Sequence, residues 1–184
     1  MRRFGGGRNR NKMNGQNGGA RVRRAGPSDV EAIRGLLAAA FSPWASHYSA
    51  RAFAGTVPGT AVLLGRLSEG PVWVAVAGAG LYTARAELVG TLGAVEEANG
   101  LYLRSLAVAP RHQGRGVGRG LIERAEAYAI ARDHDRLLLS TAPFLVPAVR
   151  LYHRLGFVET EAGSTDLAGT PLVSMEKCLR PRST

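Results

Sequence analysis

The stretch from Leu103 to Gly118 constrains the fold more than any other part of this 184-residue chain. An apolar, strand-like run passes into a basic loop rich in glycine, and a helical pattern begins directly after the loop. Glycines let a ligand approach the backbone closely, and the first N–H groups of a helix have no partner within the helix. The loop carries three glycines and three arginines: Gly114, Gly116, Gly118, Arg111, Arg115 and Arg119. This arrangement predicts a binding site for a phosphate-bearing ligand.

The spacing of these glycines disfavours two common nucleotide-binding loops. A P-loop ends in Gly-Lys-Ser or Gly-Lys-Thr, and neither tripeptide occurs in the chain. A dinucleotide-binding loop has the pattern Gly-x-Gly-x-x-Gly. The third glycine position is occupied by Arg119 when the count starts at Gly114, and by Leu121 when it starts at Gly116.

The segment Gln113–Gly118 resembles the coenzyme A pyrophosphate loop of the GNAT N-acetyltransferase superfamily, in which Gln or Arg, two residues, Gly, one residue and Gly or Ala follow one another. Three further segments extend the resemblance. Ser105–Pro110 is similar to the fourth strand of that family and its exit, and Leu88–Gly93 is similar to its third strand. Arg150–Phe157 is similar to its late helix, which carries a tyrosine and ends in Gly-Phe. The resemblance covers residues 21 to 178.

The resemblance implies a single α/β domain over residues 20–180, with a mixed, mostly antiparallel sheet flanked by helices. It also implies acetyl-CoA as the cosubstrate. The expected pyrophosphate contacts come from Gln113, Gly114, Arg115, Gly116, Val117, Gly118 and Arg119. The expected contacts with the pantetheine arm come from the backbone of Leu106, Ala107 and Val108, where a strand amide would also serve the thioester oxygen.

Candidate catalytic residues are supplied unevenly. Tyr152 corresponds to the family tyrosine that is often assigned as general acid, and the alternative is that its ring simply packs in the core. Many relatives carry a glutamate base in the fourth strand, but the aligned residue here is Tyr102. Glu96 and Glu97 are therefore the expected base, acting through water, and His47 is a further option.

A second departure from the family pattern is Leu145, which stands where relatives commonly place an asparagine that contacts the cofactor arm.

Pattern and turn signals predict the remaining elements. Ser28 and Glu31 form a capping-box pattern at the start of a helix that runs to about Ala40. Residues 62–67 and 72–77 are predicted to form a hairpin. Further strands are expected over residues 20–24, 88–95, 101–108, 137–140, 157–161 and 172–177. Further helices are expected over residues 47–55, 116–133 and 147–156.

The net charge of +10 is a property of one end of the chain. The first 24 residues contain eight basic and no acidic residues, whereas the remainder has sixteen basic and fourteen acidic residues. The eight are Arg2, Arg3, Arg8, Arg10, Lys12, Arg21, Arg23 and Arg24. Residues 1–19 contain almost no apolar side chains, so we predict a disordered basic tail. Whether residues 1–12 belong to the natural protein is left open, because Met13 is an alternative start.

Other composition features limit the possible partners. No run approaches the roughly 20 apolar residues of a membrane span, so we expect no membrane partner and a cytoplasmic location. Cys178 is the single cysteine, which excludes an intramolecular disulfide, and we interpret it as a packing residue. The histidines His112, His134 and His153 lack metal-ligand spacing, so we expect no metal.

Three functions are compatible with these features. The leading hypothesis is transfer of an acetyl group from acetyl-CoA to a primary amine of a small molecule or protein, by direct attack in a ternary complex. A second hypothesis is a regulatory module that binds coenzyme A without turnover, which the missing strand glutamate permits. A third is a nucleic-acid-associated protein that works through its tail, although the tail has only one aromatic residue, Phe4, and we expect no nucleic acid partner. A homodimer is left open.

Overall fold

A seven-stranded sheet organises the part of the chain that this computed structural model describes, residues 19–78, 86–161 and 166–179. Neighbouring strands are antiparallel except β4 and β5, which pair in parallel. This mixed, mostly antiparallel sheet confirms the expected fold class. In spatial order the strands are β1 (Arg21–Arg24), β2 (Val72–Ala77), β3 (Glu87–Glu97), β4 (Gly100–Val108), β5 (Arg136–Thr141), β9 (Val173–Cys178) and β6 (Val158–Thr160). A separate two-stranded ribbon consists of β7 (Asp166–Leu167) and β8 (Thr170–Pro171).

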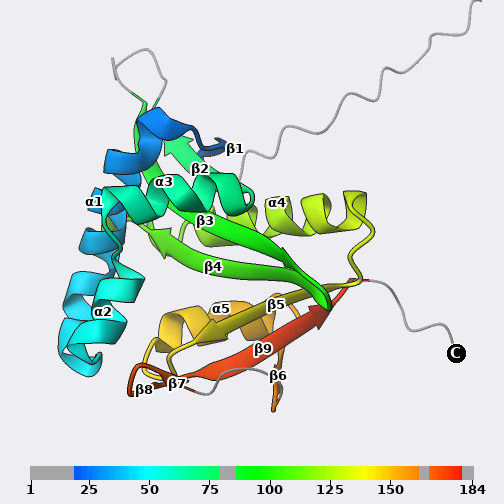
Figure 1. Cartoon of the computed structure of the whole chain (residues 1–184). Coiled ribbons are helices and arrows are strands. Elements are labelled where there is room, and N and C mark those ends of the chain that lie inside the picture. Colours follow the sequence, from blue (N-terminus) through cyan, green and yellow to red (C-terminus); the bar gives the residue numbers. More distant parts are fainter. Residues whose placement is uncertain (1–18, 79–85, 162–165, 180–184) are drawn as a thin grey trace, which may run out of the picture.

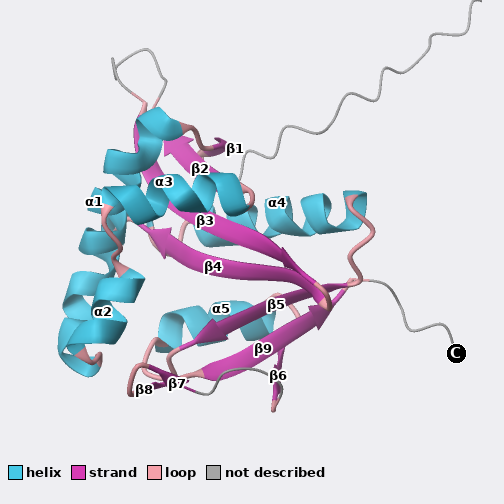
Figure 2. Ribbon diagram, viewed as in Figure 1, coloured by secondary structure: helices cyan, strands magenta, loops and turns pink. Residues whose placement is uncertain are grey.

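Helices cover both faces of the sheet (Figures 1 and 2). The α-helices are α1 (Val30–Phe41), α2 (Ala50–Thr56), α3 (Thr60–Glu69), α4 (Val117–Ala131) and α5 (Val146–Arg154). Short 3-10 turns are η1 (Pro27–Asp29), η2 (Ser42–His47) and η3 (Pro110–His112). Helices α4 and α5 pack on one face, and α1 and α3 pack on the other.

The strand β2 shows why the central strands are apolar throughout. Successive side chains of a strand point to opposite faces, so each face of β2 must match a different helix layer. Trp73 and Ala75 lie in the core under α4, whereas Val72 and Val74 lie in the core under α1 and α3. Trp73 and Val74 are both at most 1% exposed. Burial on both faces therefore explains the unbroken run of apolar residues.

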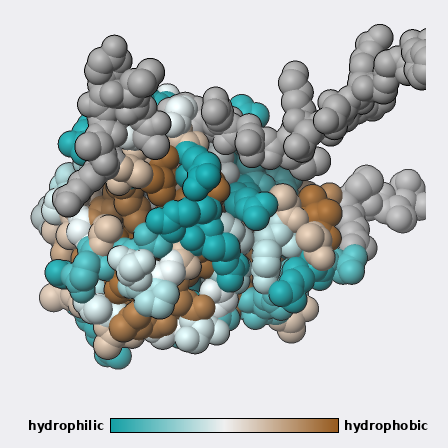
Figure 3. Space-filling model, turned by 90° about the horizontal axis from the view of Figure 1, so that it is seen from above, coloured by the Kyte–Doolittle hydropathy of each residue, from teal (hydrophilic) through white to brown (hydrophobic). Residues whose placement is uncertain are grey.

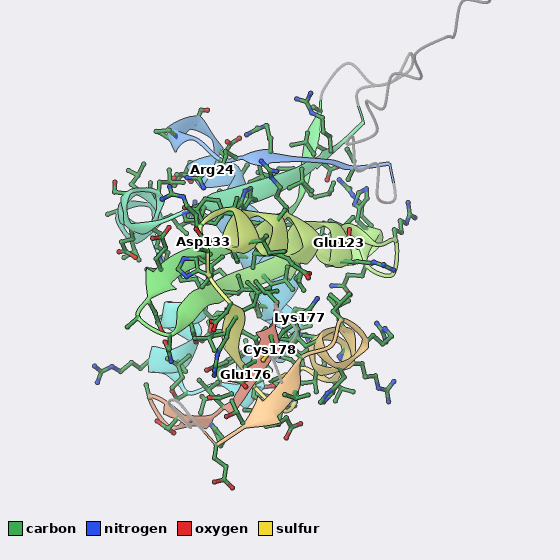
Figure 4. All side chains as sticks on the ribbon, turned by 90° about the vertical axis from the view of Figure 1, so that its right-hand side faces the viewer. Arg24, Glu123, Asp133, Glu176, Lys177 and Cys178 are labelled. Atoms are coloured by element: carbon green, nitrogen blue, oxygen red, sulfur yellow. The ribbon has the colours of Figure 1, made fainter. Side chains whose placement is uncertain are left out.

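Contacts between helices and β9 hold the two halves of the sheet together where strand pairing is short. β4 and β5 pair only from Leu101–Leu137 to Leu103–Leu139. On β9, Lys177 forms a 2.8 Å ion pair with Glu126 of α4, and both side chains are mostly buried. Figure 4 shows Lys177 on this strand below α4. The β5–β9 half is thus attached to α4 as well as to β4.

One predicted hairpin is wrong. Residues 62–67, expected to be a strand, lie within helix α3, so only β2 remains of the predicted pair. A short apolar run does not reveal its own period. In the structure Leu63 is 6% exposed and Leu67 packs beside it in the same core, while Val62 is 52% exposed. The four-residue spacing of Leu63 and Leu67 is helical. It can be recognised only when the sheet shows which side of the segment is buried.

The predicted capping box is also wrong. Gly26, not Ser28, precedes the first helical turn, and its N–H donates to the Asp29 carboxylate at 2.8 Å. Asp29 is held in place by Arg23 of β1. The carboxylate of Glu31 instead accepts hydrogen bonds from Thr60 and Arg34. The remaining predicted strands and helices are present, with ends shifted by at most three residues.

The surface offers few extended apolar areas within the described residues. Exposed large apolar side chains are spread over α3, α4, α5, β6 and β7, and the view in Figure 3 shows hydrophobic patches separated by a hydrophilic band. Cys178 is exposed, which contradicts our interpretation of it as a packing residue. None of the described helices is both long and apolar enough to cross a membrane. The predicted tail, residues 1–19, falls almost entirely outside the described residues.

Candidate active site

The separation of β4 from β5 creates an unpaired strand edge. Beyond Leu103, no described strand pairs with β4 on its β5 side, and Figure 1 shows the two strands diverging toward their carboxyl ends. We call residues 104–108 the unpaired β4 edge. Backbone groups at such an edge are free to bind an extended ligand. Two of the sequence predictions, the strand contacts and the glycine loop, meet at this edge.

The glycine loop, residues 113–119, joins the end of β4 to the start of α4. Gly114 and Gly116 have φ values of +73° and +82°, a left-handed conformation that favours glycine. The first hydrogen bond of the turn runs from the Gly120 N–H to the Gly116 carbonyl at 2.9 Å. The N–H groups of residues 117–119 precede this bond, so they have no acceptor within α4. A helix start of this kind can bind an anion.

Gly118 brings the parts of the site into contact. A Cβ atom at this position would lie 3.1 Å from Leu151 Cδ2 of α5 and 3.6 Å from Val108 Cγ2 of β4. The side chain of Gln113 donates to the Val108 carbonyl at 3.3 Å, which ties the loop to the strand end. The loop, the unpaired β4 edge and α5 are therefore adjacent.

The three loop arginines differ in how much charge they leave for a ligand. Arg111 pairs with Glu87, and Arg119 pairs with Glu123 at 2.7 Å. Arg115 is exposed and forms no ion pair with the described residues. Arg115 is therefore the loop arginine whose charge is least compensated by the described residues.

A bulge in β4 sets which backbone and side-chain groups face the site. Leu92 of β3 stands opposite two residues, Ser105 and Leu106, and Ser105 has a φ of +56°. The extra residue reverses the alternation of side chains along β4. Leu103 and Leu106 both pack toward α4, although a regular strand would place them on opposite faces, and Ala107 is buried under α1.

Tyr152 lies on α5, adjacent in sequence to Leu151, with only 7% of its surface exposed. Its ring packs edge-on against Phe157 at 5.7 Å between centroids. Burial raises the pKa of the Tyr152 phenol, and the phenols of Tyr102 and Tyr48 add to this effect. The hydroxyl forms no hydrogen bond with the described residues. The ring is thus a core residue, and its phenol is fully protonated at neutral pH.

The structure does not bring Glu96 and Glu97 to the other predicted site residues. Both lie where β3 turns into β4, and Glu96 pairs with Leu101 at the closed end of the β4–β5 pair. Leu106 lies five residues beyond Leu101 along β4, a distance of about 17 Å. Glu96 accepts a hydrogen bond from Tyr128 at 3.0 Å. Its carboxylate therefore belongs to a surface contact between the sheet and α4.

His47, the other predicted base candidate, lies in a group of aromatic rings. We call Trp44, His47, Tyr48, Phe53 and Phe144 the aromatic cluster. Phe144 follows β5 and is the centre of the cluster, with its ring centroid 5.1 Å from His47 and 4.9 Å from Tyr48. The β7–β8 ribbon borders the same region, because the Ser49 N–H donates to Thr170 at 3.1 Å and the Ser49 hydroxyl donates to the Ala168 carbonyl at 2.6 Å.

Comparisons with known proteins decide the family. The model of the acetyltransferase (GNAT) family matches residues 32–157. The chain belongs to this family. A curated relative of this GNAT domain is streptothricin acetyltransferase of Streptomyces lavendulae, with 34% identity over 70 residues. That match covers 38% of this chain and 37% of the relative, so it spans little more than a third of the relative's length.

Solved structures share the fold of the GNAT domain. PaiA N-acetyltransferase from Thermoplasma acidophilum, in complex with coenzyme A, aligns with a TM-score of 0.72 and 16% identity, covering 86% of this chain and 98% of that chain. The putative acetyltransferase yncA from Salmonella typhimurium, with its cofactor acetyl-CoA, aligns with a TM-score of 0.64 and 20% identity, covering 90% and 96%. At these identities the likeness establishes the fold.

Sequence reasoning missed several residues of the GNAT domain's site. The bulge at Ser105 left a signal in the sequence, because apolar residues switch from the odd positions 101 and 103 to the even positions 106 and 108. Phe144 had no such signal, since its partners come from a segment almost a hundred residues earlier. Leu145, the noted departure from the family pattern, is half-buried at the start of α5. Within the described residues no group of three or more metal-ligating side chains is present.

Proposed function

We propose that this chain transfers an acetyl group from acetyl-CoA to a primary amine by direct attack in a ternary complex. The observation that carries the proposal is the continuity of the unpaired β4 edge with the glycine loop. The edge offers backbone groups to the extended pantetheine arm, and the loop offers the first N–H groups of α4, which have no acceptor within the helix, to the pyrophosphate. The two solved relatives whose structures hold coenzyme A or acetyl-CoA support the same ligand.

In the proposed reaction the neutral amine nitrogen attacks the thioester carbonyl carbon, and the carbon–sulfur bond then breaks. A backbone N–H of the unpaired β4 edge stabilises the developing negative charge on the carbonyl oxygen. Tyr152 donates its phenolic proton to the departing thiolate, which leaves as the free thiol. The amine proton passes to solvent, and the Tyr152 phenolate takes up a proton from solvent before the next turnover. We assign no base role to Glu96 or Glu97, because they lie at the closed end of the strand pair.

The raised pKa of Tyr152 affects this role in two ways. It keeps the phenol protonated at every ordinary assay pH, so Tyr152 always has a proton to donate. It also makes the phenol a weaker acid than usual. Because the thiol of coenzyme A has a pKa of about 8.5, proton transfer from the phenol to the thiolate is unfavourable by itself. The transfer neutralises a thiolate in a dry environment, and removal of that buried charge offsets the weak acidity.

We propose a small-molecule amine as the acceptor class. The curated relative named for streptothricin supports a small acceptor, and the aromatic cluster supplies apolar and π surface beside α5. Fold alone does not determine the acceptor. We also propose a cytoplasmic location, where the exposed thiol of Cys178 stays reduced.

The test combines binding and turnover. Acetyl-CoA at 100 times its Kd stabilises the folded state by about 2.7 kcal/mol, which raises Tm by about 5 to 10 °C for a domain of this size. Thiol release is then followed with small-molecule amines in one arm and with lysine-containing peptides in another. A thermal shift with amine-dependent thiol release supports the proposal. A shift without thiol release supports a coenzyme A-binding module, and the lack of any shift contradicts both.

A further inference from the structure

The bulge of β4 needs an external support. Ser105 adopts a φ of +56°, which a residue with a side chain rarely adopts and which persists only when its surroundings enforce it. The bulge directly precedes Leu106, the first of the backbone contacts proposed for acetyl-CoA. A small change at Ser105 would rotate the peptide that follows it, and with it the N–H proposed to face the carbonyl oxygen.

Arg66 supplies this support from the helix layer. It lies on α3 and donates one hydrogen bond to the Ser105 Oγ at 2.8 Å and a longer one to the Gly55 carbonyl of α2 at 3.4 Å. One guanidinium therefore links the bulge to the helix that borders the aromatic cluster. An arginine can do this because its planar head carries several donors in fixed directions.

The surroundings of Arg66 disfavour its positive charge, because the side chain is half-buried and lies near a second arginine. Arg66 is half-buried, and burial followed by the charge of Arg104 lowers its pKa, while Glu69 acts in the opposite sense. Arg104 is itself paired with Glu69 at 2.5 Å. A cavity of about 20 Å³ lies between these polar groups and apolar side chains of the α1 and α3 layer, such as Leu63. The Arg66 guanidinium therefore lies at the edge of the core, close to a second guanidinium.

We propose that Arg66 is a positioning residue that holds the β4 bulge in shape and thereby aligns the backbone of Leu106 with the reacting carbonyl. This inference rests on the proposed acetyl transfer for its kinetic consequence. Its structural consequence is independent of turnover. Without Arg66, Ser105 relaxes toward an ordinary strand conformation, and the bulge loses its fixed geometry.

The kinetic test uses Arg66→Met together with Ser105→Gly. Arg66→Met lowers kcat by about 10-fold to 100-fold, because a small displacement of the Leu106 N–H weakens its hydrogen bond to the carbonyl oxygen in the transition state. The Kd of acetyl-CoA changes by less than about threefold, since the glycine loop is untouched. Adding Ser105→Gly recovers at least about threefold of the lost kcat, because glycine adopts a φ of +56° without support.

Two further variants separate positioning from general stability. Arg66→Lys keeps the charge but has a single head group, so its kcat lies between those of the wild type and Arg66→Met. Arg34→Met is the matched control, since Arg34 is an exposed arginine of α1 paired only with Glu31, and its kcat stays within about twofold of the wild type. Equal kcat in Arg66→Met and Arg34→Met overturns the proposal. So does a failure of Ser105→Gly to restore any activity.

Amide hydrogen exchange separates this inference from the proposed function. In the ligand-free protein, the amides of Ala107 and Ala109, which lie on the β3 side of β4, exchange about 10-fold faster in Arg66→Met than in the wild type, and Ser105→Gly reverses part of the change. If the wild type shows no turnover, acetyl transfer is wrong and the exchange result still tests the support given by Arg66. Unchanged exchange at both amides contradicts the inference whatever the activity.

Discussion

At the scale of single residues, the site depends on backbone conformation as much as on side-chain chemistry. Gly116 and Ser105 both have positive φ values, at opposite ends of the segment that would contact acetyl-CoA. Glycine adopts this conformation freely, whereas Ser105 adopts it while its hydroxyl accepts a hydrogen bond from Arg66. Tyr152 adds a protonated hydroxyl in a nearly dry position.

Tyr152→Phe is expected to lower kcat by about 10²-fold to 10⁴-fold, the usual loss when a general acid is removed. The ring keeps its contact with Phe157, and the lost hydroxyl has no partner among the described residues, so the unfolding free energy at pH 7 changes by less than about 1 kcal/mol. Steady-state kinetics and thermal unfolding measure the two effects. Near wild-type kcat at saturating substrates would remove Tyr152 from the acid role.

The pKa of Tyr152 also predicts how stability depends on pH. The folded-state pKa lies above the unfolded value of about 10, so above that pH the unfolded chain releases a proton that the folded protein retains. Stability is therefore present below pH 10 and falls above it, by up to about 1.4 kcal/mol per pH unit for this group. Tyr152→Phe removes this part of the slope in chemical unfolding at pH 9 to 11. An identical slope in both proteins would contradict the burial argument.

Gly116→Asp is expected to abolish the thermal shift by acetyl-CoA, because it puts a negative charge beside the pyrophosphate amides. Gly116→Ala is the control: a Cβ at this position meets nothing within 4 Å, so alanine adds only the strain of a positive φ, about 1 to 2 kcal/mol. Differential scanning fluorimetry with and without acetyl-CoA compares the two. An unchanged thermal shift by acetyl-CoA in Gly116→Asp would mean that the pyrophosphate binds elsewhere.

At the scale of elements, the position of α4 is set by a close approach to β3. A Cβ atom at Gly90 would lie 2.8 Å from Val117 Cγ1 and 3.0 Å from Leu121 Cδ1, so the first turn of α4 can touch the sheet only because this residue is glycine. The same turn carries the first N–H groups of α4, which have no acceptor within the helix. Packing under α4 and ligand binding at its start are therefore linked.

Gly90→Ala is expected to destabilise the fold by about 1 to 3 kcal/mol, as overpacking usually does, and to weaken acetyl-CoA binding by displacing the first turn of α4. Gly35→Ala on the exposed side of α1 is the matched control. A Cβ there meets nothing within 4 Å, and alanine in a helix gains up to about 1 kcal/mol over glycine. Urea unfolding and acetyl-CoA titration of both variants measure these effects. Equal stability of the two variants would mean that α4 can shift freely.

At the scale of the whole molecule, charge and site are separated along the chain. Eight of the 24 basic residues lie within residues 1–24, whereas the glycine loop, the unpaired β4 edge and Tyr152 all lie between residues 104 and 152. Ala20 is 3% exposed and belongs to the core under α4. Three of the eight, Arg21, Arg23 and Arg24, lie on β1, so part of the basic segment belongs to the sheet.

Deletion of residues 1–18 is expected to leave the Kd of acetyl-CoA within about threefold, because all proposed contacts remain. Affinity for a polyanion such as heparin is expected to fall, and its salt dependence to become shallower, since fewer cations release fewer counterions. Titrations of the full chain and the truncated chain at two salt concentrations check both statements. Loss of acetyl-CoA binding would make the segment part of the site.

The sequence by itself determined the strands of the seven-stranded sheet, most of the helices and the glycine loop, because these depend on local periodicity and on the conformational freedom of Gly114 and Gly116. The helix over residues 60–69 was misjudged, since a short apolar run shows its period only against a partner surface. Tertiary structure alone placed Arg66 on Ser105, gathered the aromatic cluster around Phe144 and left Glu96 far from the reacting groups. These relations join residues far apart in the chain, and only the register of the sheet and the packing of helices on it specify them.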